Sequence, residues 1–553
     1  MSDLLTLFKE FLTCESAIRT IEVMDLMRSH TDNGTYEQLK NILLPIVPYS
    51  SRTIFNQLDA RIRLASHLCC KEPAKVLVSG AGPCGLRSAV ECALLGYQVT
   101  VYELRSDCSR HNILKTWEST ANDLASLGIK IFVPSFKVYG GNLHIGTNEL
   151  QLFLLKVSLL LGVEVHFSHG VCGILDPAVS LPNSSPGKWR AWVLPEAEAR
   201  AFLKQPDLFQ TDLAELALKP GEADVSQHEK INLVNYREAA ISAEGAISRA
   251  EFKHSPELLK SARFVEFNHL YVAEGQSSRL IRNLGFHRKL FRLAQAIGIV
   301  VNMDFLNTTG PETKMQEFVV TRMAAKWREG PLGPIFDSGL ELENLEYMRG
   351  TKNHFLAATT KCAFLQNFGV IKEVKDTVFE SLQPDNVNVD KLYEMGRMIA
   401  NAVGIPSQAP FRKKNGTQIF DFSCRGSCSE PYKYFDSINS DYESMMVIPI
   451  GDALQNPYWP QGLGINGGFH NSLDGVWSAH IYHTSKDPAL VIQERVGYNY
   501  QEASYRLTDG KTWTADPTSR YDNEIFKQLH RADIAANVPF RLTKRVRALI
   551  GFQ

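Results

Sequence analysis

The sequence predicts an α/β protein in which a parallel-sheet domain is interrupted by a second, mixed α/β domain. An apolar strand, Lys75–Ser79, runs into a glycine-rich turn and then a helix, the pattern of a βαβ unit. Far downstream, a second apolar run, 445–450, ends on a glycine and an aspartate. Residues from about 290 to 425 mix strands and helices without a glycine fingerprint, so the first domain is predicted to be discontinuous around them.

Taken in order, the elements begin with amphipathic helices over residues 1–70, ahead of the first strand. A long apolar helix at 148–162 precedes a strand at 163–167, and a further strand follows at 188–195. We therefore predict a helical N-terminal extension (1–70), a Rossmann-like domain (71–305) with a helical insertion at about 196–259, a substrate-side domain (306–420), a return segment of the first domain (421–485) and a helical C-terminal extension (486–553).

Length and composition indicate a large globular protein. The chain has 553 residues, of which 44% are hydrophobic and 22% charged. A net charge of −1 and a single basic cluster, 541–547, do not indicate a nucleic-acid partner. The N-terminus is amphipathic and not a signal peptide, while the most apolar stretch, 152–165, contains Lys156 and Glu164 and is too short to span a bilayer. We expect a cytoplasmic protein without a membrane partner.

The glycine-rich turn predicts a dinucleotide site. Gly80, Gly82 and Gly85 follow the G-x-G-x-x-G pattern where a helix begins. This spacing permits a tight turn, close approach of the backbone to a pyrophosphate, and close helix–strand packing, while the helix N-terminus offers free N–H groups. Glu103 ends the next strand, where a carboxylate can accept hydrogen bonds from a ribose diol.

The downstream motif favours FAD over NAD. In flavoprotein hydroxylases, a strand that ends in Gly-Asp, here Gly451 and Asp452, places the carboxylate on the ribityl hydroxyls of FAD. A loop with Trp459, Gly462 and Gly464 leads into a helix. The N-terminus of that helix can stabilise the anion of a reduced flavin.

The ten cysteines are scattered, which suits reduced thiols in the cytoplasm. Cys424 and Cys428 lie too far from other cysteines or histidines for a zinc site, so no metal is predicted. Cys84 lies inside the glycine turn and would touch a dinucleotide by position. It could be a small residue that fits a cramped turn, or it could have a redox role.

Several segments together resemble the flavin monooxygenase domain of the MICAL proteins, within the p-hydroxybenzoate hydroxylase-type superfamily. They include "GAGPCGLRSAVECALLGYQVTVYELR", "SRHNIL" and "GDALQNPYWPQGLGINGGFHNSLDGVW". The resemblance runs from the N-terminal helices to residues 516–521. The sequence ends at Gln553 without the calponin-homology and LIM modules of full-length MICAL proteins, so we expect a stand-alone domain.

The resemblance implies a set of site residues. Those around the adenosine, pyrophosphate and isoalloxazine are Cys84, Glu103, Arg105, Arg110 and Asn112, and Asp452 matches the ribityl contact. Tyr347, His354 and Trp459 fall where the family has aromatic residues near the flavin ring, with His354 in place of a tyrosine. Glu274 replaces the aspartate of the family's D-G turn, one methylene longer. Asn112, Trp459, His354 and Tyr347 are therefore the predicted catalytic residues.

The resemblance also implies a reaction. NADPH would reduce FAD, dioxygen would form a flavin hydroperoxide, and one oxygen would pass to a soft or electron-rich acceptor. The predicted acceptor is a methionine of actin or another protein. Two alternatives stay open: a stand-alone hydroxylase of a small aromatic molecule, and an FAD-binding module without turnover. The acceptor itself cannot be read from the sequence.

Overall fold

The computed structural model describes most of the chain. The described residues are 2–203, 261–321, 335, 338–455 and 463–485, with short gaps at 33, 67–68, 71–73, 135, 137–142, 179–186, 287, 293–295, 414, 423, 429–430 and 438–440. The predicted C-terminal extension, Trp459, Gly462 and all but the start of the predicted helical insertion lie outside the described residues.

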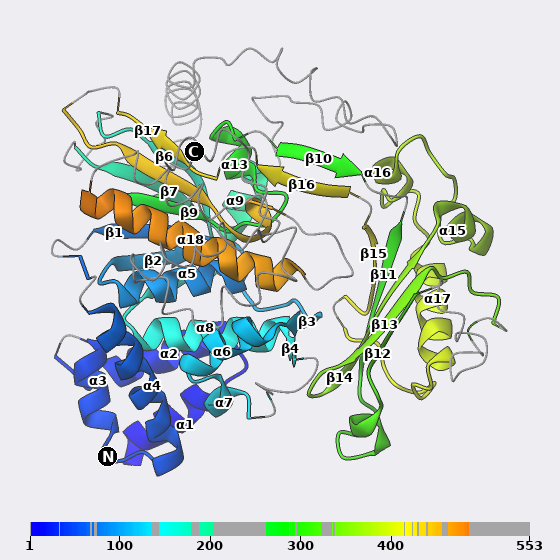
Figure 1. Ribbon diagram of the computed structural model, residues 1–553, viewed down its shortest axis with the longest axis horizontal. Coiled ribbons are helices and arrows are strands. Elements are labelled where there is room, and N and C mark those ends of the chain that lie inside the picture. Colours follow the sequence, from blue (N-terminus) through cyan, green and yellow to red (C-terminus); the bar gives the residue numbers. More distant parts are fainter. Residues whose placement is uncertain are drawn as a thin grey trace, which may run out of the picture.

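A six-stranded sheet forms the centre of the first domain (Figure 1). In spatial order it contains β17 (Lys433–Phe435), β18 (Met445–Pro449), β9 (His269–Val272), β1 (Lys75–Ser79), β2 (Gln98–Tyr102) and β5 (Glu164–His166). All neighbours are parallel except β17 and β18, which are antiparallel. Because β18 follows the second domain in the sequence, the prediction of a discontinuous first domain is confirmed.

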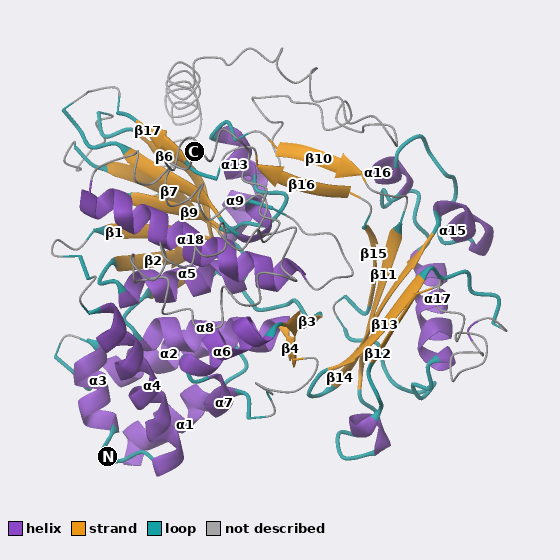
Figure 2. Ribbon diagram, viewed as in Figure 1, coloured by secondary structure: helices purple, strands orange, loops and turns teal. Residues whose placement is uncertain are grey.

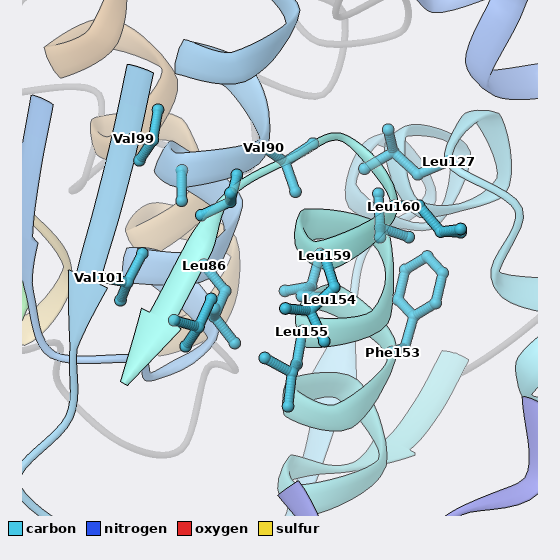
Figure 3. Close-up of a cluster of buried hydrophobic side chains, with 14 of the residues drawn as sticks. Leu86, Val90, Val99, Val101, Leu127, Phe153, Leu154, Leu155, Leu159 and Leu160 are labelled. Carbon is cyan, nitrogen blue, oxygen red and sulfur yellow. The ribbon is translucent and has the colours of Figure 1, made fainter. Parts of the chain in front are cut away.

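The two faces of this sheet are covered differently. Val76 and Val78 of β1 join the hydrophobic cluster of the helices on one face, while Leu77 joins the cluster on the other. The helical layer contains α5 (Pro83–Leu94), α8 (Thr147–Leu160) and α18 (Leu463–Ser485), and Figure 3 shows side chains of α5 and α8 packing beside β2. The opposite layer is the antiparallel sheet of β6 (His169–Leu175), β7 (Trp189–Pro195) and β8 (Arg263–Phe267).

The predicted N-terminal helices are present and dock on α8. They are α1 (Ser2–Thr13), α2 (Ala17–Arg28), α3 (Tyr36–Leu43) and α4 (Tyr49–Ala65). Lys156 of α8 donates from Nζ to the carbonyls of Leu12 and Cys14, both at 2.8 Å, and Arg28 donates to the carbonyl of Leu159 at 2.6 Å. The lysine that interrupts the apolar stretch therefore anchors the N-terminal helices to the sheet domain.

A buried charge network, called here the core network, joins α4, α5 and α6 (Glu118–Ser126). Its members are at most 3% exposed: Arg61, Arg87, Glu91 and Asp123. Arg87 donates from Nε and Nη2 to both oxygens of Asp123, at 2.7 and 2.8 Å, and from Nη1 to Glu91 at 2.5 Å. Arg61 adds a bond to Glu91 at 3.1 Å. Two cations and two anions thus neutralise one another inside the protein.

The second domain contains a five-stranded antiparallel sheet. In spatial order it contains β12 (Phe318–Thr321), β13 (Asn344–Arg349), β14 (Asn353–Thr360), β11 (Ile297–Asp304) and β15 (Thr417–Asp421). The helices α15 (Cys362–Phe368), α16 (Val378–Ser381) and α17 (Val389–Ala402) belong to this domain, and α17 covers the sheet face that points away from the first domain (Figures 1 and 2).

The boundary predicted at residue 305 is wrong, because β11 pairs with β14 and β15 of the second sheet. The chain crosses between the domains at an antiparallel pair, β10 (Arg288–Arg292) and β16 (Cys424–Cys428). The boundary therefore lies before residue 297.

One antiparallel pair of strands of the first domain lies against the second sheet. It consists of β3 (Ile113–Thr116) and β4 (Leu143–Gly146). We call it the β3–β4 hairpin, although residues 117–142 of the sequence separate its two strands. Ile113 packs with Val300, Met348, Phe355 and Ala357, so these side chains define the face of the second sheet that points toward the first domain. Within the described ranges, the protein has no helix with the length and apolar character needed to cross a bilayer.

Candidate active site

The glycine turn between β1 and α5 leaves room for a ligand at the start of the helix. Gly80 has φ +103°, and a Cβ there would lie 2.6 Å from the carbonyl oxygen of Ala273. A Cβ at Gly85 would overlap the carbonyl of Gly80, so turn and helix pack tightly. At Gly82, the N-cap of α5, a Cβ would meet no atom within 4 Å. The space before the helix N-terminus is thus open on the side where a pyrophosphate would bind.

Glu103 lies directly after β2, buried beside this turn. Its Oε2 accepts the backbone N–H of Ala81 at 2.8 Å, and its Oε1 accepts the N–H and Nε of Arg105 at 3.1 and 2.7 Å. The structure therefore brings Glu103 to the glycine turn as predicted. It also pairs Arg105 with Glu103, so the guanidinium is engaged by the carboxylate.

Glu274 closes the opposite side of the turn. Its carboxylate accepts the hydroxyls of Ser79, at 2.5 Å, and Ser278, at 2.7 Å. Burial raises the pKa of Glu274, although the two hydroxyl bonds oppose the shift. This residue joins the carboxyl ends of β1 and β9, and its side chain is already held within the protein.

The two sequence motifs meet at Cys84. A Cβ at Gly451, which has φ +60°, would lie 3.1 Å from the Cys84 Sγ, and one at Gly468 of α18 would lie 2.5 Å from it. Burial raises the pKa of Cys84 to about 12, so the thiol stays protonated at neutral pH. Both observations favour Cys84 as a small residue that fits a cramped turn.

Asp452 follows in a short 3-10 turn, η5 (Gly451–Ala453). Burial raises the pKa of its carboxyl, while the positive charges of Arg110 and Arg288 lower it. Arg288 also donates to the main-chain carbonyls of Asp452, at 3.1 Å, and Ala453, at 2.8 Å. Asn471 of α18 accepts the N–H of Gly451 at 2.8 Å. Arg288 carries no motif in the sequence. Asn471 lies within the quoted segment 451–477, but only the fold shows its contact with Gly451.

The start of α18 is tied to the β3–β4 hairpin. Asn466 Oδ1 accepts the N–H of Trp117 and the hydroxyl of Thr120, both at 2.8 Å, and its Nδ2 donates to the carbonyl of Lys115 at 3.0 Å. Gly464 lies in the first turn of this helix. The N-terminus of α18 is therefore fixed next to the segment that carries Asn112.

Asn112 lies at the junction of the two domains. Its carbonyl accepts the N–H of Thr147 at 2.8 Å and the Thr147 hydroxyl at 2.7 Å. Its Oδ1 accepts a 3.4 Å bond from Nδ2 of Asn302, on β11 of the second sheet. The predicted catalytic asparagine is thus held from both domains.

Tyr347 and His354 do not lie beside Asn112, and the expectation that they flank the same ring is corrected here. Side chains alternate along a strand, and their neighbours Met348 and Phe355 are the ones that face Ile113. Tyr347 instead belongs to the cluster on the helix-covered face, and in the strand register His354 lies opposite Met303 of that same cluster.

On that face the two side chains form a buried chain of hydrogen bonds. The Tyr347 hydroxyl lies 2.9 Å from His354 Nδ1, and His354 Nε2 lies 3.0 Å from Glu312 Oε1. Burial lowers the pKa of His354, which favours the neutral imidazole that such a chain requires. The side chains that sequence reasoning missed, Asn302 and Met348 among them, lie on the face toward the first domain.

Three known proteins that are similar to the chain in sequence all carry MICAL names. The chain is 27% identical over 544 residues to the [F-actin]-monooxygenase mical2b of Danio rerio, which covers 94% of this chain and 27% of that protein. It is 27% identical over 544 residues to human [F-actin]-monooxygenase MICAL2 (93% of this chain, 23% of that protein) and 30% identical over 491 residues to Danio rerio mical1 (85% and 34%). The chain thus spans about a quarter to a third of the length of these relatives.

No family model matches the chain. Among solved structures, aklavinone-11 hydroxylase with FAD and aklavinone has a TM-score of 0.46 at 12% identity, covering 78% of this chain and 67% of that one. The halogenase CmlS has a TM-score of 0.45 at 13% identity, covering 79% and 63%. The fold assignment accordingly rests on the strand order and layers described above. On its sequence relationships, the chain belongs with the MICAL-type flavin monooxygenase domains.

Proposed function

We propose that this chain is an FAD-dependent, NADPH-consuming monooxygenase that acts in the cytoplasm and oxygenates methionine sulfur in actin or another protein. The observation that carries the proposal is the meeting of the two motifs at Cys84, where the open N-terminus of α5 and the Gly451–Asp452 turn lie together. A dinucleotide needs both a phosphate-binding helix end and separate carboxylates for its sugar portions.

The described residues fit FAD. The N-terminus of α5 with Gly82 would bind the pyrophosphate, Glu103 the ribose and Asp452 the ribityl hydroxyls. When bound, FAD supplies hydride acceptance from NADPH and the reaction with dioxygen. We assign Asn112 to the ring, since it lies where the domains meet. The chain's own task is to orient the ring and keep water from it.

The remaining assignments follow the family pattern and belong to the same proposal. They are Arg110 for the pyrophosphate, with Trp459, Gly462 and Gly464 for the loop beside the ring. Arg105 would act through Glu103, to which it is bonded. Glu274 would act through the glycine turn, which it braces at Ser79.

The proposed acceptor rests on the relatives. Several are named F-actin monooxygenases, and mical3a of Danio rerio is named a protein-methionine sulfoxide oxidase. The thioether of methionine is a soft, oxidisable group, and the sulfoxide is its first oxidation product.

The first test is cofactor content. Purified protein should be yellow and release FAD on denaturation. Gly82→Val should lose FAD, because its side chain extends into the open space at the helix N-terminus, while the unfolding midpoint without added FAD stays close to that of the wild type. FAD retained by Gly82→Val would contradict the assignment.

The second test concerns the acceptor. Actin filaments should raise NADPH consumption above the basal rate, and mass spectrometry should find methionine sulfoxide on actin with catalase present. Catalase separates directed oxygenation from diffusing peroxide. If actin has no effect while a phenol or an indole raises the rate, the chain is a small-molecule hydroxylase. If FAD is bound but NADPH is never consumed, the chain is a binding module.

A further inference from the structure

Four ionisable side chains lie along the seam between the β3–β4 hairpin and the second sheet; we call them the seam cluster. Lys115 on β3 and His144 on β4 are cross-strand partners in the hairpin. Glu346 on β13 and Glu317, just before β12, oppose them from the second domain. Two basic residues of one domain thus face two acidic residues of the other.

The two pairs of the seam cluster differ in how well they are bonded. His144 Nδ1 lies 2.6 Å from Glu317 Oε1, and Glu317 also accepts the N–H of Arg349 at 2.9 Å. Lys115 Nζ lies 3.9 Å from Glu346 Oε1, beyond hydrogen-bond distance. Within the described part of the chain, no hydrogen bond reaches the Glu346 carboxylate, although the residue is only 3% exposed.

A buried carboxylate in this condition is costly to the folded protein. Burial raises the pKa of Glu346, while Lys115 and His144 lower it and Glu317 raises it further. Groups whose charge is poorly satisfied occur most often where they serve a function. Glu346 lies two residues before Met348 on β13, so both side chains are on the sheet face that points toward the first domain. A function for Glu346 is therefore expected at the boundary between the domains.

The hairpin that Lys115 belongs to determines the position of Asn112. β3 begins at the residue after Asn112, and Thr147, the residue after β4, holds the Asn112 carbonyl. Both ends of the hairpin therefore converge on this residue. In the hydrophobic contact with the second sheet, the hairpin contributes Ile113, and the seam cluster adds charged contacts across the same boundary.

We propose that Glu346 is a positioning residue of the site: through Lys115 it holds the β3–β4 hairpin, and with it Asn112, against the second sheet. At 3.9 Å and without a hydrogen bond, the attraction between Lys115 and Glu346 is electrostatic and not directional. It therefore tolerates a small movement of the hairpin when a ligand binds. The proposal rests on the proposed function for the role of Asn112. The link between Glu346 and the hairpin does not depend on it.

The test uses three variants of the full chain: Glu346→Gln, Lys115→Met and the double variant. Glu343→Gln is the matched control, since Glu343 pairs with the exposed Lys361 at a similar 3.7 Å, away from the seam. Amide hydrogen exchange of the segments 113–116 and 143–146 is measured without FAD. Both single variants should exchange faster there, by about tenfold, with the control unchanged.

The unfolding midpoints of the variants show whether Glu346 positions the hairpin or simply stabilises the folded protein. Because burial raises the pKa of Glu346, its contribution to stability is full below the ordinary value of 4.5 and is lost as pH rises through the raised value. Glu346→Gln should therefore unfold no earlier than the wild type at pH 7–8. Lys115→Met should unfold earlier, and adding Glu346→Gln should restore its midpoint. If Glu346→Gln unfolds as early as Lys115→Met, the proposal is overturned.

The loaded enzyme gives the last readout. Anaerobic reduction of bound flavin by NADPH should be about tenfold slower in Glu346→Gln, with a changed pH profile and FAD still bound. A wild-type rate and profile in this variant would overturn the positioning role. If the wild-type protein binds no FAD, the proposed function fails, while hydrogen exchange still decides whether Glu346 holds the hairpin.

Discussion

The core network and the seam cluster each contain two basic and two acidic side chains, but they differ in burial and in bonding. All four members of the core network are buried, whereas Lys115 and Glu317 of the seam cluster keep 28% and 25% of their side chains exposed. In the core network, Arg87 forms two hydrogen bonds to Asp123 at 2.7 and 2.8 Å and another to Glu91. In the seam cluster, Glu346 has one cation at 3.9 Å. The group in which every charge is bonded lies inside one domain, and the loosely bonded pair, Lys115 and Glu346, lies between two. This difference indicates which charges hold the fold and which are available for function.

The largest expected effect tests the core network. Arg87→Met removes the residue that bonds both acids and leaves Arg61 as the remaining cation of the core network. We expect a loss of about 3–5 kcal/mol in the free energy of unfolding, measured by urea denaturation. Arg19→Met breaks an exposed pair with Glu10 (2.7 Å) and should cost far less. Similar losses in both variants would mean that burial does not distinguish the two kinds of pair.

A smaller effect is expected at the hydrogen-bond chain behind the second sheet. Tyr347→Phe removes the hydroxyl that bonds the buried Nδ1 of His354 and should cost about 1–2 kcal/mol. Because this face points away from Asn112, flavin reduction by NADPH should keep its wild-type rate. Stopped-flow absorbance measures that rate. A large fall in the rate with unchanged stability would place Tyr347 at the reaction after all.

The smallest effect concerns Glu274, a partly exposed residue whose carboxylate is bonded by two hydroxyls. Burial raises its pKa, so its contribution to stability is full below pH 4.5 and declines as pH rises through the raised value. Between pH 5 and 8, Glu274→Gln should therefore have a slightly higher midpoint of thermal unfolding than the wild type. Asp59→Asn, an acid outside both groups whose carboxylate accepts the Tyr36 hydroxyl, should show no such gain. If Glu274→Gln instead loses stability relative to the wild type, and loses more as pH rises, the pKa of Glu274 is lowered and not raised.

The cofactor end could be predicted from the sequence because its requirements are local. The strand, the glycines at 80, 82 and 85, and the acid at 103 lie in one βαβ unit, so their spacing already fixes their arrangement. The contacts that join this unit to the rest are not local. Arg288 and Asn302 reach the site from distant elements, and no pattern around them marks their role. Asn471 lies in the downstream motif segment, but its bond to Gly451 appears only in the fold.

The misplacement of Tyr347 and His354 has a physical cause. Every residue of β14 is buried, so the alternation that usually identifies the two faces of a strand is missing. Without it, the sequence cannot tell whether His354 or Phe355 points to the first domain. β11 raised the same problem, since all but its last residue are buried and its pairing partners lie far along the chain.

The strand order of the central sheet has a consequence for synthesis on the ribosome. β1 needs β9 as a neighbour, and β9 needs β18, which is made only after the whole second domain. The second sheet, by contrast, is complete within residues 297–421. The second domain can therefore fold while the edge of β9 is still unpaired, and that edge is exposed to aggregation until residue 449 has emerged. Slow codons placed before residue 449 should lower the yield of soluble protein more than the same slow codons placed after it.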